Sequence, residues 1–391
     1  GFNSFGICCG TSPKDFSTPF DGGQIVYETG SSNSPNSYAP NPALATGVNP
    51  ATGAPAGAQI YGAFPHTPNA VQYLYSLETQ MQLPSQMVFT LGYQGSIGRH
   101  FLRIIYLPFF YSNAGTPFGG GVYMAKPDTN SMYNGLNAHL ERRFQHGFSA
   151  NAIYTFSKSL DQLSFEGPGS LSNQTDPVNQ KTEYGPSDFD LHNHLTISGV
   201  WDIPVPFKGM EKTLLGGFQV NGIYTWHTGY PWTPTTYNPN ALPQIAGGAT
   251  VNPQRPYQQI LPAGSSCSND AFINGTNFGG TNGSSYFVTS SPAPGPGQAT
   301  GTVHPGIGRN SFRGPCYQDL DVSVAKQFAF HTMDHDTLLR LQANFFNAFN
   351  HLNLQPLQNY QSTTSIGNGQ FGLSPGGDSG RVVELSARFE F

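Results

Sequence analysis

Four side chains of metal-ligating types stand at alternating positions in one short segment. They are Asp188, Asp190, His192 and His194. Alternate residues of an extended segment share one face, so all four would project to the same side. Carboxylate and imidazole groups both suit divalent metal ions. The same pattern arises where a polar loop enters a strand, and we favour this simpler interpretation, which predicts no metal site.

Two other segments carry catalytic or phosphate-binding motifs in unsuitable surroundings. Gly377-Asp378-Ser379-Gly380 copies the nucleophile motif of serine proteases. A nucleophilic serine needs a base and an oxyanion hole around it, and the flanking sequence supplies neither, which favours a tight polar turn. Gly367–Gly372 fits GxGxxG, but a loop precedes it and Pro375 follows it, whereas phosphate binding requires a strand before and a helix after. We therefore predict no catalytic residue, no enzyme and no cofactor.

The four cysteines have no metal-binding spacing. Cys267 and Cys316 lie in a long polar region, where they form either a disulfide, if the region is extracellular, or two unpaired thiols. The adjacent pair Cys8 and Cys9 indicates no function.

Charged residues also alternate within two predicted strand regions. His139, Glu141 and Arg143 would share one face of an extended segment, and Asp319, Asp321 and Arg340 would share another. Charges in this arrangement are typical of a hydrated barrel interior. They could tune a passage for solutes, but they form no recognisable acid/base pair.

The composition limits which elements can position these residues. The 391 residues include only 17 basic and 22 acidic ones, with 47 Gly, 32 Pro and 13% aromatic residues. Charge this sparse, against about 25% in typical domains, excludes a coiled coil, and the frequent Gly and Pro exclude a helical enzyme. The net charge of −5, with no basic stripe, argues against nucleic acid as a partner. The mean hydropathy of −0.33 fits either a soluble protein or a barrel with a polar lumen.

Alternating apolar and polar residues predict long β-strands. The clearest strand is Arg381–Phe391, with an apolar face of Val383, Leu385, Ala387, Phe389 and Phe391. Eight more are expected at 71–82, 87–94, 136–141, 148–157, 194–203, 218–227, 319–324 and 339–345, with room for a tenth at Gln24–Thr29. Most are about 10–14 residues long, enough to cross a bilayer when tilted.

The connections between these strands alternate between short and long. The short ones are 83–85, 145–147, 204–213 and 331–336, and the long ones are 108–131, 158–190, 231–316 and 351–380. Outer-membrane barrels have short periplasmic turns and long extracellular loops. The sequence therefore predicts an all-β, antiparallel transmembrane barrel over residues 71–391, preceded by a Gly/Pro/Asn-rich loop region over residues 1–70.

Two features of the loops and strand ends add to this prediction. The long loop 231–316 is too polar to bury a core and should be a mobile surface segment. Aromatic residues at predicted strand ends should form a girdle at the membrane interface, rather than reflect ordinary strand propensity. They are Trp201, Trp226, Tyr230, Trp232 and Phe349.

Five sequence blocks resemble the barrel of TonB-dependent outer-membrane receptors, most closely the Oar-like group, whose full-length members carry a carboxypeptidase-regulatory-like domain. The blocks are Tyr133–Phe144, Ala152–Asp161, Asp188–His194, Gly306–Pro315 and Asn344–His351. The resemblance spans about residues 71–391 and implies part of a 22-stranded barrel in a Gram-negative outer membrane. A signal peptide, a TonB box and a plug are not recognisable, so we expect a C-terminal fragment that either forms an open curved sheet or misassembles.

The resemblance implies energised uptake of a scarce, unidentified small ligand. Expected partners are outer-membrane lipid, the TonB system acting through a plug, and the barrel-assembly machinery. That machinery would read the last strand, through Val383, Leu385, Ala387, Phe389 and Phe391. A passive porin-like or surface-binding barrel is the alternative. An outer-membrane hydrolase, using the Asp188–His194 segment, is a more distant one.

Overall fold

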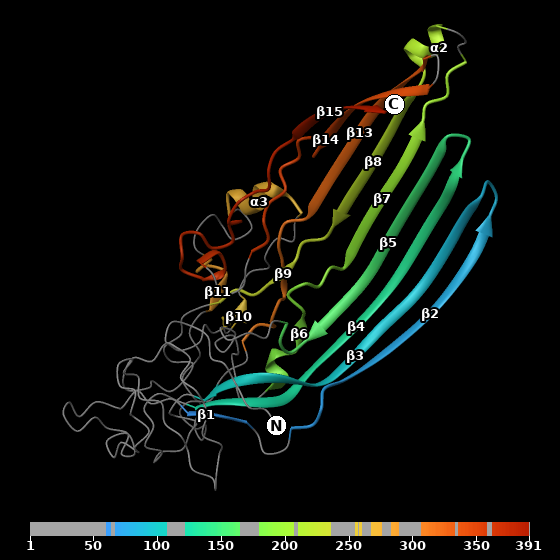
Figure 1. The fold of residues 1–391 in the computed structure, drawn as a ribbon. Coiled ribbons are helices and arrows are strands. Elements are labelled where there is room, and N and C mark those ends of the chain that lie inside the picture. The colour runs from blue at the N-terminus through green and yellow to red at the C-terminus, as the bar shows by residue number, and fades with distance from the viewer. Residues whose placement is uncertain are drawn as a thin grey trace, which may run out of the picture.

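The computed structural model contains one large antiparallel sheet with loops gathered at one end (Figure 1). It describes residues 60–63, 67–107, 122–164, 180–206, 210–235, 255–256, 258–259, 267–275, 283–288, 306–332, 335–357 and 362–390. Among these, the helices are α2 (Met210–Leu215), α3 (Asn269–Ile273), and the 3-10 helices η2 (Gln180–Glu183) and η4 (Ser362–Thr364). Within the described residues, no helix has the length and apolar character needed to cross a membrane.

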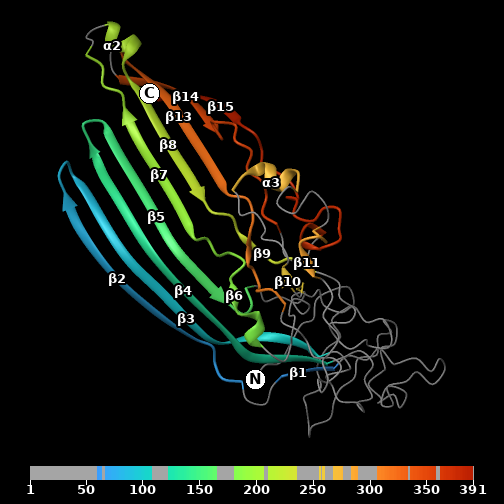
Figure 2. The same cartoon turned by 180° about the vertical axis from the view of Figure 1, so that it is seen from behind.

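Nine long strands follow one another in the order of the chain. They are β2 (Val71–Leu83), β3 (Met87–Leu107), β4 (Val122–Gln145), β5 (Phe148–Asp161), β7 (Asn193–Asp202), β8 (Phe218–His227), β13 (Tyr317–Thr332), β14 (His335–Phe346) and β15 (Val382–Glu390). Each pairs antiparallel with the next, and β2 and β15 form the two edges of the sheet. This confirms the nine predicted strands and the open curved sheet (Figures 1 and 2).

Strand register gives the sheet two chemically different faces. One face carries the apolar and aromatic members of each strand and leaves many of them exposed, as with Leu77, Leu136, Phe156 and Leu385. We call it the outward face, because exposed apolar side chains over a wide band suit contact with lipid. The opposite face carries the polar members, such as Asn151, and register pairs Thr90 with His139 and Asn221 with Ser323 on it. We call it the luminal face.

The described strands are longer than the alternation predicted. Strand β3 continues to Leu107 and β4 starts at Val122, so the predicted link 108–131 shortens to 108–121. The alternation is lost there because the paired strands continue beyond the membrane band, with irregular register between Gly98 and Arg103. Short β1 (Ile60–Ala63) pairs parallel with β4 in this extension. The strand expected at Gln24–Thr29 lies outside the described residues.

The links still sort between the two ends of the sheet (Figure 1). The strand pairs β2–β3, β4–β5, β7–β8 and β13–β14 are connected at one end of the sheet, by links 84–86, 146–147, 203–217 and 333–334. The pairs β3–β4, β5–β7, β8–β13 and β14–β15 are connected at the other end, by links 108–121, 162–192, 228–316 and 347–381. The difference in length between the links at the two ends is not uniform. The link that contains helix α2, 203–217, is similar in length to link 108–121 at the other end. Outer-membrane barrels have short periplasmic turns and long extracellular loops, so we name the first end the periplasmic end and the second the extracellular end.

Loops from distant parts of the chain share a hydrophobic core at the extracellular end. The core consists of buried Trp232, Phe272, Phe287, Leu357, Ile366 and Phe371 with Ala271. Short strands tie the loops together: β9 (Pro231–Trp232) pairs with β12 (Phe312–Arg313), and β10 (Gln258–Gln259) pairs with β11 (Phe287–Val288). The prediction that loop 231–316 buries no core is therefore wrong. The few aromatic residues of loop 231–316 are enough to form a core because the 347–381 link contributes the remaining buried apolar residues.

The structure contradicts the aromatic girdle prediction for two of its five residues, and for the other three it stays a prediction. Trp201 lies exposed on the outward face near the periplasmic end, and Trp226 shares that face, in register with Leu195. Phe349 is exposed in the turn after β14. Trp232, however, is only 1% exposed within the loop core, and Tyr230 packs edge-on against the luminal His227. Proximity to a strand end could not distinguish a membrane interface from a loop core.

Candidate functional site

The luminal face has a hollow that crosses six neighbouring strands. The hollow has a volume of about 920 Å³ and crosses strands β4, β5, β7, β8, β13 and β14. Polar luminal residues that line it include His139, Glu141, Asn151, Ser198, Asn221 and Asp321. Two neighbouring atoms in it, Oδ1 of Asn221 and Oγ of Ser323, have no hydrogen-bond partner among the described residues. The hollow thus combines polar side chains at its surface with two buried atoms whose hydrogen-bonding capacity is unused among the described residues.

Four of the six predicted luminal charges, His139, Glu141, Arg143 and Asp321, line this hollow, and Asp319 and Arg340 do not. The Nε2 atom of His139 is 2.5 Å from Oδ1 of Asn151. Across the sheet, Oδ1 of Asp321 accepts a hydrogen bond from the backbone N–H of Asn347. Arg340 donates from Nη2 to the Gln219 side chain. These contacts fix the charged groups in place, and they provide no paired acid and base.

Arg309 joins three extracellular segments at one buried point. Its guanidinium is 6% exposed and forms an ion pair with the equally buried Asp161 at the end of β5. It also donates to the carbonyl oxygens of Asp161 and Glu183, each at 2.8 Å. A second contact reaches Oδ1 of Asp188 at 3.4 Å. Because the Arg309 guanidinium and the Asp161 carboxylate are both removed from water, their pairing holds links 162–192 and 228–316 together over the luminal face.

Arg313 forms a second buried cluster beside the first. Its Nη2 atom pairs with the carboxylate of Asp190, whose side chain has no exposed surface, and Nη1 donates to the Asp190 carbonyl at 2.6 Å. The other Asp190 oxygen accepts from the backbone N–H of Ser159 at 2.6 Å. His192 completes the cluster, with Nε2 at 3.2 Å from the Asp190 carboxylate. Burial and the positive charge of Arg313 lower the pKa of His192 below its usual value of 6.5.

The four residues considered as metal ligands separate into three environments. Asp188 binds Arg309 and Asn310, whereas Asp190 and His192 bind Arg313. His194 lies within the sheet, with its ring against that of His227. Across the described part of the chain, no group of three or more His, Cys, Asp or Glu side chains could hold a metal ion. The segment is not extended as the alternation assumed, because residues 188–189 form a turn, and arginines bind Asp188, Asp190 and His192.

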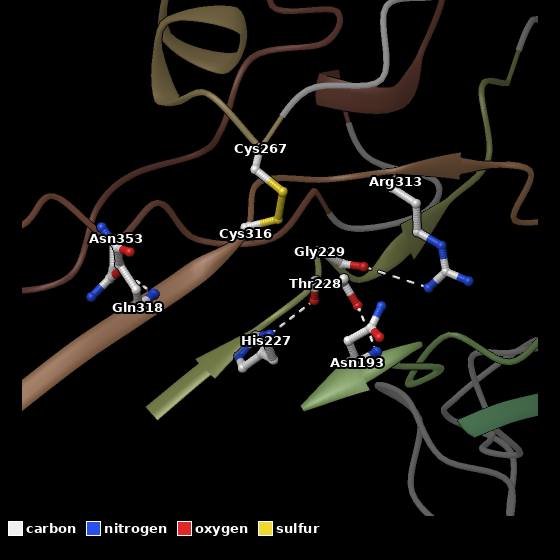
Figure 3. Close-up of a disulfide and its surroundings, with 9 residues drawn as sticks. All are labelled: Asn193, His227, Thr228, Gly229, Cys267, Arg313, Cys316, Gln318 and Asn353. Carbon is white, nitrogen blue, oxygen red and sulfur yellow. Dashed lines mark hydrogen bonds between the residues drawn. A yellow bond between two sulfur atoms is a disulfide. The ribbon is translucent and has the colours of Figure 1, made fainter. Parts of the chain in front are cut away.

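A disulfide ties the loop core to the sheet. Cys267, just before α3, is bonded to Cys316, just before β13, with their Cα atoms 4.8 Å apart (Figure 3). This settles the choice left open by the sequence. Nearby, the N–H of Gln318 donates to Oδ1 of Asn353 and Arg313 reaches the carbonyl of Gly229, so both long loops are fastened where the strands end. Cys8 and Cys9 lie outside the described residues.

The two motif-like segments are structural. Gly377–Gly380 is an irregular extended segment, not the tight turn that we expected: Gly377 forms a bridge with Leu354, and the N–H of Asp378 donates to the Asn353 carbonyl. The Gly367–Gly372 segment is a turn-rich loop in which both terminal glycines have positive φ, 89° and 77°. It delivers Phe371 to the loop core.

The last strand has the face assignment expected of it. Val383, Leu385, Ala387 and Phe389 lie opposite Phe345, Ala343, Leu341 and Leu339 of β14, on the outward face. All nine residues of β15 are exposed. Phe391 lies outside the described residues.

Sequence reasoning missed the arginines that organise the loops. Arg309 and Arg313 lie in the Gly306–Pro315 block, and their main partners lie in the Ala152–Asp161 and Asp188–His194 blocks. One signal for the pairing was present in the sequence: the first block carries the arginines, and the other two blocks, which resemble the same family, carry aspartates. Their pairing could not be assigned, because alternation describes strands and not loops.

These features define a class of protein: the wall of a transmembrane β-barrel, with a polar lumen and a structured extracellular cap. A family model described as an outer membrane beta barrel domain matches residues 4–384. The chain therefore belongs to this outer-membrane β-barrel family and is located in the outer membrane. No curated protein sequence matches the chain.

Solved outer-membrane structures resemble the chain weakly. The outer membrane transporter YddB from Escherichia coli has a TM-score of 0.43 and 9% identity, covering 83% of this chain and 33% of that one. The ferripyoverdine receptor of Pseudomonas aeruginosa, bound to ferripyoverdine, has a TM-score of 0.38 and 12% identity, covering 81% and 26%. The chain thus spans about a third of the length of such structures, or less.

Proposed function

We propose that the chain forms part of the barrel wall of a TonB-dependent outer-membrane receptor of the Oar-like group, which takes up a scarce small ligand. The five blocks of resemblance support the group. The observation that carries the proposal is the pair of buried arginine clusters, which join two long loops into a fixed cap over a polar lumen. A receptor needs such a cap to present a defined binding surface.

In this proposal the wall and its cap have separate roles. The cap captures the ligand outside, and the hydrogen-bonding groups of the luminal hollow face the plug and the route of the ligand. The TonB system acts on the plug, and the wall itself performs no chemistry. The barrel-assembly machinery recognises strand β15 through Val383, Leu385, Ala387, Phe389 and Phe391.

Conductance separates this function from a passive porin. The full-length protein is purified from outer membranes and inserted in planar lipid bilayers. A plugged receptor stays closed in buffer and conducts only when a denaturant such as urea unfolds the plug. Steady ion conductance in buffer alone would contradict the proposal and favour the porin. As a second arm, the purified periplasmic domain of TonB is expected to bind the receptor, and a porin would not bind it.

A further inference from the structure

A polar band crosses strands β2 to β5 on the outward face, near the extracellular end. Tyr75 lies opposite Gly95, Gly95 opposite Asn134, and Asn134 opposite Lys158. Tyr93 adds its hydroxyl from the adjacent row, beside Leu136 and Phe156. We call Tyr75, Tyr93, Asn134 and Lys158 the outward polar band. The position of this band is unusual, because polar groups on the outward face are directed toward lipid.

The two tyrosines fix the orientation of Asn134. Each hydroxyl donates to Oδ1 of Asn134, at 2.7 Å in both cases. The tyrosine protons and both lone pairs of this oxygen are thereby used. Gly95 makes the arrangement possible, since a Cβ there would lie 2.4 Å from the Tyr75 ring. The amide nitrogen of Asn134 has no partner among the described residues and keeps two N–H donors.

Lys158 supplies a positive charge that the described part of the protein does not neutralise. Its side chain is exposed, and no hydrogen bond or ion pair is formed to it by the residues that the structure describes. Lys326, another lysine on the outward face, differs. It donates to three backbone carbonyls at the end of α2 and lies over two aromatic rings. A lysine on a lipid-facing surface with no partner among the described residues is a candidate for binding a ligand from the membrane.

The protein blocks access to this band from the other side. The neighbouring luminal residues of β5, Ser157 and Ser159, are buried beneath link 162–192. The hydroxyl of Ser157 donates to the carbonyl of Leu191, and that of Ser159 lies 2.8 Å from the hydroxyl of Ser187. A ligand of Lys158 must therefore approach from the lipid side, where exposed Phe156 and Tyr93 flank it.

We propose that Lys158 and Asn134 bind the phosphate group of an outer-leaflet lipid headgroup. Phosphate oxygens accept hydrogen bonds. The band presents the ammonium group of Lys158 and the amide N–H groups of Asn134, all of which are donors. The extracellular end of the outward face lies at headgroup level in an outer-membrane barrel. The flanking aromatic rings contact the apolar part of the same lipid.

The test uses the full-length protein purified from outer membranes in mild detergent. Native mass spectrometry counts the phosphorylated lipids retained per protein. Lys158→Gln is expected to reduce retention about fivefold, the factor given by about 1 kcal/mol per lysine near an anionic surface. Asn134→Asp keeps the oxygen that the tyrosines need but replaces the donors with negative charge, so it should reduce retention at least as much. Lys158→Arg should retain the lipid.

Arg388→Gln is the matched control, because it removes one positive charge from the exposed luminal side of β15. It should leave retention unchanged, and heat-modifiable gel mobility verifies that each variant is folded. Equal retention in wild type and Asn134→Asp would overturn the proposal, as would an equal loss in Arg388→Gln. Displacement of the bound species by millimolar inorganic phosphate would assign the site to soluble phosphate and also overturn it.

Discussion

Replacing Arg309 with methionine should release the extracellular cap while leaving the barrel wall folded. The substitution keeps the length of the side chain but leaves the Asp161 carboxylate buried beside only the Ser164 hydroxyl. It also removes the donor to the Glu183 carbonyl. Breaking one side of a buried ion pair costs about 3–5 kcal/mol. This cost falls on the loops, because the strands keep their own hydrogen bonds.

Hydrogen exchange measures this cost at individual amides. The N–H of Ser187 donates to the Ser159 carbonyl, and that of Asp190 donates to the Ser187 carbonyl, so both are protected while link 162–192 stays in place. A loss of about 3–5 kcal/mol should raise their exchange rates by roughly 10²- to 4 × 10³-fold, since every 1.4 kcal/mol is tenfold. Amides in the middle of β4 and β5 should exchange as in wild type.

Two comparisons make the result decisive. Arg388→Met removes an exposed ion pair with Glu390 and should not alter loop exchange. Asp161→Leu combined with Arg309→Met removes both buried charges and should recover part of the protection. If the Ser187 and Asp190 amides stay protected in Arg309→Met, the ion pair does not hold the cap, and the reasoning fails.

Three further predictions concern the cap and the wall. The pKa of His192 is lower in the folded loop than in the unfolded loop, so the unfolded loop binds a proton more readily. Protection of the loop amides should therefore fall as pH drops below about 6.5. Hydrogen exchange measured at pH 7.5 and 5.5 should show this fall in wild type and a smaller one in His192→Asn. Cys316→Ser removes a cross-link over 49 residues, worth about 4 kcal/mol by loop-closure entropy, so amides of α3 should exchange faster and β8 should not change. Gly95→Val should displace the Tyr75 ring and lower stability by about 1–3 kcal/mol, seen as a lower midpoint of heat-modifiable mobility. Gly92→Ala, where the nearest atom to a Cβ is 3.6 Å away, should have little effect.

The sequence predicted the sheet because its strands obey one simple rule. Where a strand separates lipid from a polar lumen, every second residue must be apolar, and segments such as 218–227 display this directly. The rule stops where strands leave the membrane, so the extensions of β3 to Leu107 and of β4 back to Val122 were missed. Pairing continues there without a lipid-facing side to impose alternation.

The cap was harder to predict because its contacts join distant loops. Trp232 and Phe371 meet in one core across a long stretch of chain, and no local pattern indicates such a contact. The same is true of the pair formed by Arg309 and Asp161. The cysteines were the exception, since their chemistry limits the partners, and Cys267 with Cys316 was among the two alternatives considered.

The direction of the two edge strands limits how the barrel can close. Strands β2 and β15 are separated by seven others in an antiparallel path, so both run from the extracellular to the periplasmic end. Joining these two edges, within one chain or between copies in the same membrane, would create a parallel seam. An antiparallel barrel therefore requires an odd number of strands in addition to these nine, starting and finishing with strands that run toward the cell exterior. Strand parity thus excludes a ring made from repeated copies of this strip alone.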